Sequence, residues 1–501
     1  METINPAIWP VLAFLAALIC IGAWCNRSLK RSDHFQRDFY IAGRNLGGVV
    51  LALTLVATYG SVSSFVSGPG IAWQLGYGWV VFAAPQIITG FFILGVLGKK
   101  MAVLARRTGS LTVIDLIDAR YGSKPLSVLL ALVLIVFFTA TVVGQFIGGA
   151  QIFAAVTGWD YKAGLLVFAA VTVIYTSSGF KAVALTDAVC AVLMLTGMAT
   201  LGYSILESGG GLEGIRQTLA SQSVGDDGIS NLFKPDAGGA LPYTLLFSSW
   251  LLVGFCTLGL PQSMVRCMSY KKSSNLSTAM IVATIVCGAL MIGMTLLGVL
   301  SRGVVLEKPA NGTDAVIPLL IVGHMSPVMA GITIIGPLAA TMSTVSSLLI
   351  ASAAAVARDL AKQLKGPEYL RTQSPDASRH IAVATTLILG AVSILLALYP
   401  QDIVVWVNMF AFGGLESAFM WCVVLGLFWP RMNTRGAILG IVLGLGLYVI
   451  AMATGYKLMG FHNIVIGTVA GLVGSIAGSL TAPRPGIETM RIFFPHKIPQ
   501  D

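Results

Sequence analysis

Charged residues are scarce in this chain of 501 residues. Asp, Glu, Lys and Arg together make up 10% of it, whereas 56% is apolar and the mean hydropathy is +0.85. Soluble domains carry roughly a quarter charged residues, so these values exclude a soluble protein. Apolar runs of about 20 residues, long enough to cross a bilayer, recur along the whole length. The sequence therefore predicts an all-α, multi-pass membrane protein in a lipid bilayer.

Motifs of catalysis and nucleotide binding are absent as well. The chain has no P-loop, no HExxH and no CxxC, and its five histidines are scattered. Its seven cysteines have no metal-type spacing and are expected to be small core residues. These absences argue against an enzyme and against an ATP-driven pump.

The formal net charge of +10 does not indicate a nucleic-acid partner. The basic residues fall in short loops on alternate sides of the apolar runs, which is the pattern that orients a membrane protein. Most of the 31 lysines and arginines lie on one side if the N-terminus is outside. We therefore expect an outer N-terminus, a cytoplasmic C-terminus and an odd number of spans in a plasma membrane, the inner membrane of a bacterium. No obligate protein partner is evident.

The apolar runs define about thirteen transmembrane helices in a single domain, residues 1–501. They lie at residues 6–25, 47–74, 77–98, 125–156, 163–179, 184–205, 241–263, 276–300, 327–357, 381–399, 403–429, 436–455 and 462–482. Residues 483–501 would form a cytoplasmic tail.

Two of these spans contain helix-breaking residues near their centres. The second has Gly60 and then Gly-Pro-Gly at 68–70, and the seventh has Gly254 and then Gly-Leu-Pro at 259–261. Such residues release backbone groups that only protein, water or a ligand can satisfy inside a membrane. Interrupted helices at corresponding points of two halves are typical of inverted-repeat secondary transporters. The halves would be residues 47–205 and 241–429, with 6–25 and 436–482 as additional spans.

The ninth span contains a stripe of hydroxyl side chains in the stretch "PLAATMSTVSSLLIAS", residues 337–352. Ala340, Ser343, Thr344 and Ser347 share one helix face. Hydroxyl and carbonyl oxygens suit a small hard cation such as sodium. The same hydroxyls could instead bond to their own helix, and small residues favour close helix packing. The second span, whose break would expose the Ala57 and Gly60 carbonyls, favours the cation.

Two acids lie within the predicted spans, and intramembrane ionisable groups are functional candidates. Asp187 could be an acid at a helix N-terminus or a group on the exit path of a cation. Glu416, after a Gly-Gly pair, could be protonated, bonded to a neighbouring helix or in contact with substrate. Gln145 could line a cavity or join helices.

Several stretches resemble the sodium:solute symporter family, and within it the branch that carries pantothenate. They include "LALTLVATY", "SSFVSGPG", "QFIGGAQ", "GLPQSMVRCMSYK", "MSTVSSLL" and "AFGGLESAF", and the similarity spans about residues 1–480. The resemblance implies a five-plus-five inverted-repeat, LeuT-like core with broken helices in spans 2 and 7. It also implies a sodium ion as the coupling ion.

The resemblance further implies which residues serve these roles. Sodium would be held by the backbone carbonyls of Ala57, Gly60 and Ala340 and the hydroxyls of Ser343 and Thr344, with Asp187 on the release path. The expected substrate-binding set is Ser61, Ser64, Gln145, Gln262 and Glu416.

The function expected from these features is sodium-coupled uptake of a small organic solute, pantothenate or a similar anion, by alternating access. A symporter for a monocarboxylate, proline or a nucleobase is the first alternative. A sensor or channel that has kept the fold is the second, and it would be favoured by a long soluble domain after the last span.

Overall fold

A computed structural model describes residues 5–30, 32, 34–399 and 404–497. Within these residues the regular elements are helices, accompanied by two isolated β-bridges. The all-α prediction is confirmed. The first residue of the predicted span 403–429 and the last four of the predicted tail lie outside the described residues.

Among the described residues, nine helices are long and apolar enough to cross a membrane. They are α1 (Ile8–Lys30), the continuous segment Tyr77–Thr108 that contains α5 (Tyr77–Ala83), α6 (Thr89–Phe92) and α7 (Lys99–Thr108), α9 (Lys124–Thr157), α11 (Phe180–Ser208), α15 (Ser273–Ser301), the segment Pro327–Lys365 that contains α17 (Pro327–Ala354) and α18 (Ala361–Lys365), α20 (Pro375–Ala397), α21 (Val404–Phe428) and α22 (Thr434–Thr454).

Two further spans are bent pairs, at the two positions where the sequence predicts breaks. Helix α3 (Gly48–Tyr59) meets the segment Ser63–Leu75, which contains α4 (Gly68–Leu75), at 70°. The segment Tyr243–Gly259, which contains α13 (Tyr243–Val253), meets α14 (Pro261–Cys267) at 48°.

Shorter helices account for the two remaining predicted spans. Helix α10 (Tyr161–Thr176) and helix α23 (Ile464–Leu480) match the predicted fifth and thirteenth spans. Helix α16 (Val316–His324) is a third short apolar helix, in a region predicted as a loop. The other described α-helices are α2 (Phe35–Ile41), α8 (Val113–Tyr121), α12 (Gly211–Ser221), α19 (Pro367–Thr372) and α24 (Ile487–Phe493).

Local sequence signals place the ends of several of these helices. Helix α9 starts after Ser123, whose hydroxyl accepts a hydrogen bond from the Leu126 amide, and ends at Gly158, which adopts a left-handed conformation. Asp160 then caps α10 by accepting from two of its first amides. Caps of this kind satisfy backbone groups that a helix end leaves without partners.

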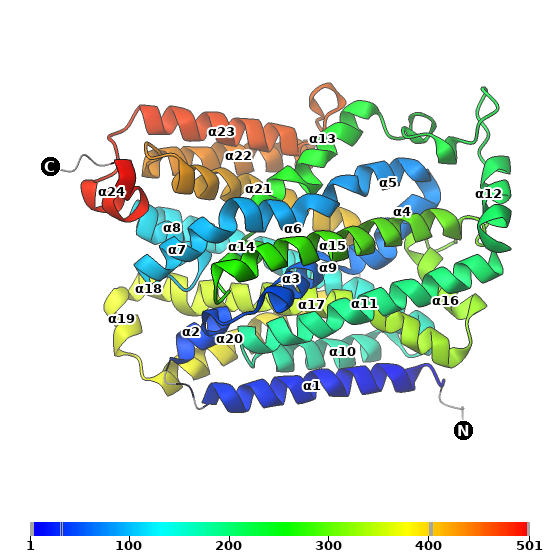
Figure 1. The fold of residues 1–501 in the computed structure, drawn as a ribbon, viewed down its shortest axis with the longest axis horizontal. Coiled ribbons are helices and arrows are strands. Elements are labelled where there is room, and N and C mark those ends of the chain that lie inside the picture. Colours follow the sequence, from blue (N-terminus) through cyan, green and yellow to red (C-terminus); the bar gives the residue numbers. More distant parts are fainter. Residues whose placement is uncertain (1–4, 31, 33, 400–403, 498–501) are drawn as a thin grey trace.

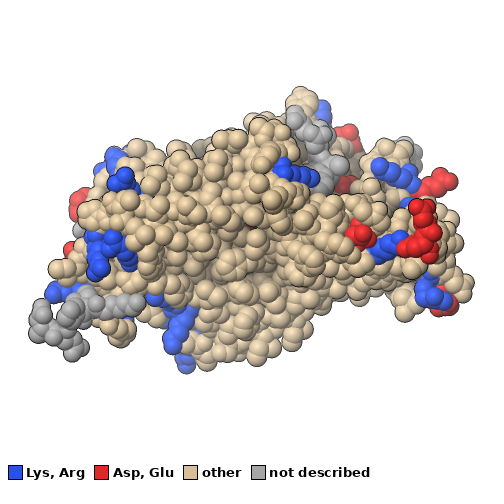
Figure 2. Space-filling view, turned by 90° about the horizontal axis from the view of Figure 1, so that it is seen from above, with Lys and Arg blue, Asp and Glu red and all other residues tan. Residues whose placement is uncertain are grey.

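The long helices run roughly along the longest axis of the molecule (Figure 1). The described chain begins at the end where α12 and α16 lie and finishes at the opposite end, beside α24, as an odd number of crossings requires. In Figure 2 the charged side chains gather at the two ends, and the surface between them is largely uncharged. This distribution fits a protein whose middle is surrounded by lipid.

Helix α17 is the central helix of the bundle. It packs against α1, α3, α9, α10, α11 and α20. Of the most apolar part of its span, 94% is buried. Its hydroxyl groups therefore face other helices rather than lipid.

Candidate functional site

The break after α3 frees backbone carbonyls in the middle of the molecule. The helix ends at Tyr59, Gly60 is extended, and the chain resumes as a helix after Ser61. The last carbonyls of a helix have no amide partner within it. Those of Ala57, Thr58 and Gly60 point instead toward α17, where hydroxyl groups meet them.

Two hydroxyls of α17 lie against these carbonyls. The Ser343 hydroxyl is 2.8 Å from the Ala57 oxygen and 3.1 Å from the Ala340 oxygen. The Thr344 hydroxyl is 2.8 Å from the Gly60 oxygen and 3.0 Å from the Ala340 oxygen. The five groups predicted from the sequence thus converge between the break of α3 and the middle of α17.

The hydroxyls also bond within their own helix, which is the alternative that the sequence left open. Ser343 donates to the Ala339 carbonyl at 2.8 Å, and Thr341 and Ser346 donate to the Pro337 and Ser343 carbonyls of α17 itself. Ser343 and Thr344 differ from these two residues because each also reaches a carbonyl of α3. This difference separates two groups of hydroxyls on one helix.

Asp187 lies on α11, one turn farther along the same interface. Its Oδ2 accepts hydrogen bonds from Thr54 at 2.6 Å and from Ser347 at 3.3 Å, and it forms an ion pair with Arg266 at 3.1 Å. Both charged side chains are almost completely buried, with 0% and 1% exposure. The Oδ1 atom has no hydrogen-bond partner among the described residues.

The sequence singled out neither Thr54 nor Arg266 of this cluster, and the arginine is the charged one of the two. It follows the predicted end of span 7 at residue 263 and lies on α14, whose direction is set by the break at Gly254 and Leu260. Its partner Asp187 is 79 residues away in the chain. The available signal was the "VRCMSYK" stretch, which carries an arginine at a membrane-helix end.

The two broken spans contact each other. The hydroxyl of Tyr59, the last residue of α3, donates to the Val253 carbonyl at the end of α13 at 3.0 Å. Gly259 lies so close to α21 that an added Cβ would be 2.8 Å from the Glu416 Cα. A larger residue at 259 would therefore separate the second break from α21.

Three of the predicted substrate residues carry buried polar atoms without partners in the described part of the chain. These atoms are Gln145 Nε2, Gln262 Oε1 and both carboxylate oxygens of Glu416. Gln145 Oε1 accepts from the Val62 amide at 2.9 Å, which fixes the side chain at the first break. Buried polar groups are normally hydrogen-bonded, so these atoms are suited to meeting a polar solute or water.

The two predicted serines lie in the first turn after the same break. Ser61 is buried and Ser64 is half-buried, and the Ser64 amide donates to the Ser61 carbonyl at 2.9 Å. Gln145, Ser61 and Ser64 are therefore brought to the first break, whereas Glu416 lies beside the second.

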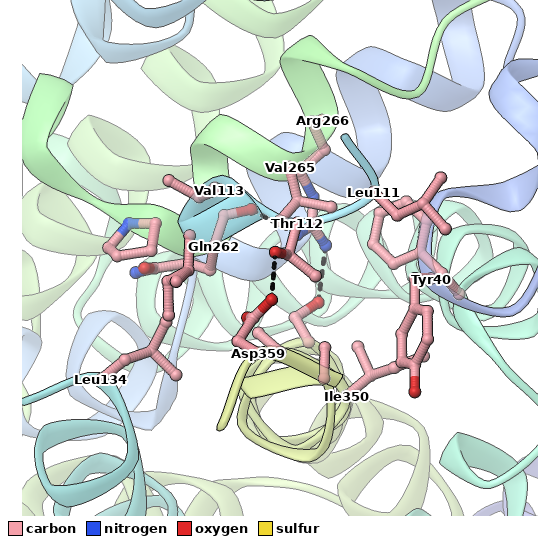
Figure 3. Close-up of a pocket in the computed structure, with 16 residues that line it drawn as sticks. Tyr40, Leu111, Thr112, Val113, Leu134, Gln262, Val265, Arg266, Ile350 and Asp359 are labelled. Atoms are coloured by element: carbon pink, nitrogen blue, oxygen red, sulfur yellow. Dashed lines mark hydrogen bonds between the residues drawn. The ribbon is translucent and has the colours of Figure 1, made fainter. Parts of the chain in front are cut away.

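A pocket lies beside the Arg266 cluster, and Arg266 and Ser347 belong to its lining (Figure 3). Gln262 and Arg266 of α14 line it on one side and Tyr40 of α2 on another. Within its lining the Thr112 hydroxyl donates to Asp359 at 2.7 Å. The lining thus extends from Ser347 in the cluster to Val113 and Ile114 at the start of α8.

Ion pairs join α8 to the C-terminal part of the Pro327–Lys365 span. Asp115 contacts Arg358 at 2.8 Å and Lys362 at 3.1 Å, and Lys362 also contacts Asp118 at 2.8 Å. Arg358 in addition donates to the Gln36 side chain of α2. Burial alone would raise the pKa of Asp115, but the charges of Arg358 and Lys362 outweigh burial and hold this pKa below its usual value.

The bundle has two interrupted spans, polar atoms without partners among the described residues at both breaks, and an oxygen cluster at one break. These features define a secondary transporter of the inverted-repeat type. Comparison with known proteins agrees with this class. The model of the sodium:solute symporter family matches residues 39–444. The chain belongs to the sodium:solute symporter family.

Similar proteins cover nearly the whole chain. It is 38% identical over 479 residues to the sodium/pantothenate symporter of Haemophilus influenzae, covering 95% of this chain and 96% of that protein. It is 37% identical to the sodium/pantothenate symporter of Escherichia coli, covering 94% and 96%. An osmoregulated proline transporter of Bacillus subtilis is 27% identical, covering 96% of each chain.

Solved structures share the fold. A Na+-coupled sialic acid symporter aligns with a TM-score of 0.79 at 19% identity, covering 96% of this chain and 99% of that one. A nucleobase-cation-symport-1 family transporter aligns with a TM-score of 0.56 at 15% identity, covering 91% and 97%. The LeuT-like fold predicted from the sequence is confirmed.

Proposed function

We propose that this protein carries pantothenate into the cell together with sodium, by alternating access. The identity of 38% and 37% to two sodium/pantothenate symporters, against 27% to a proline transporter over a similar length, carries the substrate assignment. The oxygen cluster between α3 and α17 supports the sodium assignment. Transport leaves both solutes chemically unchanged, so we assign no catalytic residues and no cofactor beyond the coupled ion.

In this proposal sodium is bound by five oxygen atoms. They are the carbonyl oxygens of Ala57, Gly60 and Ala340 and the hydroxyl oxygens of Ser343 and Thr344. The two hydroxyls are 2.8 Å from their acceptors on α3 and can turn their hydrogens away when a cation enters. Because the ligands are neutral, the ion is bound weakly enough to leave again.

Sodium bound there joins the broken second span to α17. This favours the outward-open state, in which the substrate site at the breaks is complete. Coupling requires that sodium and substrate prefer the same state, since an ion that binds both states equally shifts nothing. On the inner side the ion would leave past Asp187, whose Oδ1 has no partner among the described residues.

Pantothenate would lie at the two breaks, in contact with Ser61, Ser64, Gln145, Gln262 and Glu416. The unpartnered amide and carboxyl atoms of the last three suit its hydroxyl and amide groups. Its carboxylate suits the positive, N-terminal end of the half-helix Ser63–Leu75.

The proposed orientation in the membrane rests on the distribution of lysine and arginine among the loops. The N-terminus is outside and the C-terminus is in the cytoplasm of a bacterial inner membrane. Two inverted repeats, residues 47–205 and 241–429, form the transporting core. The additional spans at 6–25 and 436–482 flank the core, residues 483–501 form a tail, and no obligate protein partner is needed.

Uptake into proteoliposomes tests this function. Labelled pantothenate should accumulate only when sodium is higher outside, and unlabelled proline, a monocarboxylate and a nucleobase should not compete. Sodium-dependent uptake of one of these other solutes in place of pantothenate would keep the coupling and overturn the substrate.

A further inference from the structure

Arg302 is a half-buried arginine that donates no hydrogen bond to any described residue. It directly follows α15 and begins the loop that leads to α16, and its Nε is buried without a partner. The other arginines whose side chains the structure describes either donate hydrogen bonds or are exposed. A guanidinium has five N–H donors and a permanent positive charge, so Arg302 can still bind an anion.

The guanidinium is positioned by an aromatic ring instead of by hydrogen bonds. It lies 4.0 Å from the centroid of the Trp73 ring. Trp73 is 2% exposed, and its indole N–H donates to the Val305 carbonyl at 2.7 Å, which fixes the ring. A cation is attracted to the face of a tryptophan ring without using its N–H donors. Trp73 therefore orients Arg302 and leaves its donors available.

The elements around this pair are packed too closely to move independently. Trp73 lies on α4, which contacts both α15 and α16. An added Cβ at Gly70 of α4 would overlap the Thr313 carbonyl oxygen, and one at Gly298 of α15 would overlap the Pro69 carbonyl oxygen. The ring and the guanidinium thus belong to one closely packed unit formed by α4, the end of α15 and the loop before α16.

The acids of the same loop do not neutralise Arg302. Glu307 and Asp314 lie in this loop, and neither forms an ion pair with Arg302 within the described chain. Asp314 instead accepts a hydrogen bond from Ser67 at 3.1 Å, and Glu307 is exposed. A fixed positive charge without a partner therefore lies at the end of the molecule that the proposed orientation places outside.

We propose that Arg302, stacked on Trp73, is an outer binding site for the carboxylate of the solute, which the anion occupies before it reaches the breaks. The inference rests on the proposed function, because it takes the solute to be a monoanion and this end to be outside. Trp73 is ten residues after Ser63, so the rise of the half-helix places the ring roughly 15 Å from the proposed carboxylate site at its N-terminal end. The anion would move along one half-helix from Arg302 to the first break.

A structural role for Arg302 is the alternative. Arg302 follows the last residue of α15, and the helix dipole favours a cation at the C-terminal end of a helix. Such a role would contribute to the stability of the protein. It predicts no change in the KM for the solute when the charge is altered.

Uptake kinetics of Arg302→Lys, Arg302→Gln and Arg302→Glu test the site in proteoliposomes at saturating sodium. We expect the KM for pantothenate to increase in this order, by about tenfold for Arg302→Gln, because a fixed charge at an entrance raises the local concentration of an oppositely charged solute. The half-maximal sodium concentration should not change. Added choline chloride should raise the KM of the unchanged protein and affect Arg302→Gln less, since salt screens the attraction.

Lys308→Gln is the matched control, because it removes an exposed positive charge from the same loop. It should leave the KM and its salt dependence unchanged, and an effect as large as that of Arg302→Gln would overturn the inference in favour of general surface charge. An equal KM in all three Arg302 variants, whether raised or unchanged, would also overturn it, as would a loss of thermal stability alone. Failure of the proposed function would look different, as an unchanged protein without sodium-dependent pantothenate uptake.

Discussion

At the residue scale, the hydroxyl groups of α17 fall into two groups, those that contact another helix and those that donate to carbonyls of α17 itself. Ser343 and Thr344 reach carbonyls across the interface with α3, whereas Thr341 and Ser346 bond within their own helix. Ser347 belongs to the neighbouring cluster around Asp187. The sequence predicted the shared face from spacing alone, but only contacts between helices distinguish a ligand from a packing residue.

Replacing the two crossing hydroxyls tests the sodium site. We expect Ser343→Ala or Thr344→Val to raise the sodium concentration for half-maximal uptake, because each removes one oxygen ligand. A loss of about 1–3 kcal/mol corresponds to a rise of roughly 5- to 150-fold. Thr341→Val and Ser346→Ala are matched controls on the same buried helix and should leave the sodium dependence within about twofold. If the controls and the site variants behaved alike, the hydroxyls would serve packing.

Glu416 allows a separate test of the substrate side. Glu416→Gln keeps the shape of the side chain and removes its ionisable group, so a contact with pantothenate should be weakened. We expect a higher KM for pantothenate with an unchanged half-maximal sodium concentration, measured in the same uptake assay. Gln151→Ala, at an exposed position of α9, serves as the control. A change confined to thermal stability would make Glu416 a structural residue.

At the element scale, glycine and proline predict where the two spans break. They do not predict which residues of other helices contact the breaks. Gly60 and the Gly-Leu-Pro stretch at 259–261 are local signals, and both bent pairs were predicted from them. The Tyr59–Val253 bond and the position of Arg266 depend on how α3, α13 and α14 pack across the core. Helix α16 was missed because a short apolar helix does not reach the length that predicts a span.

The ion pairs between α8 and the α17–α18 span give an element-scale prediction. Asp115→Asn removes the charge that both Arg358 and Lys362 contact, so α8 and the C-terminal part of this span should separate more easily. We expect a loss of about 1–3 kcal/mol in stability, seen as a lower unfolding temperature in detergent. Glu213→Gln, which breaks an exposed pair with Arg216, should cause no measurable change. Equal effects of the two variants would argue against the role of Asp115.

The pH dependence of this link follows from the lowered pKa of Asp115. A carboxyl whose pKa is lower in the folded protein contributes stability above its unfolded pKa and loses it as the pH falls through the folded value. The difference between Asp115 and Asp115→Asn proteins should therefore be constant around neutral pH and shrink only in acid, below the ordinary pKa of Asp. A difference that vanished already at neutral pH would contradict the assignment.

At the scale of the whole molecule, composition and hydropathy were sufficient for the class and nearly sufficient for the span arrangement. All thirteen predicted spans correspond to helices or bent pairs within the described residues, although two of these helices are shorter than a typical span. The substrate could not be predicted in this way, because it depends on a few polar atoms at the two breaks. The five residues expected to bind it are distributed over both breaks, and Gln262 also lines the pocket of Figure 3.

The central claim is that one sodium and one pantothenate are carried together. The most direct test is the simultaneous uptake of radioactive sodium and labelled pantothenate by the purified protein in proteoliposomes. We predict that each solute accelerates the uptake of the other and that the two enter in a one-to-one ratio. Pantothenate uptake that proceeds equally without sodium, or sodium uptake that pantothenate does not accelerate, would contradict the account.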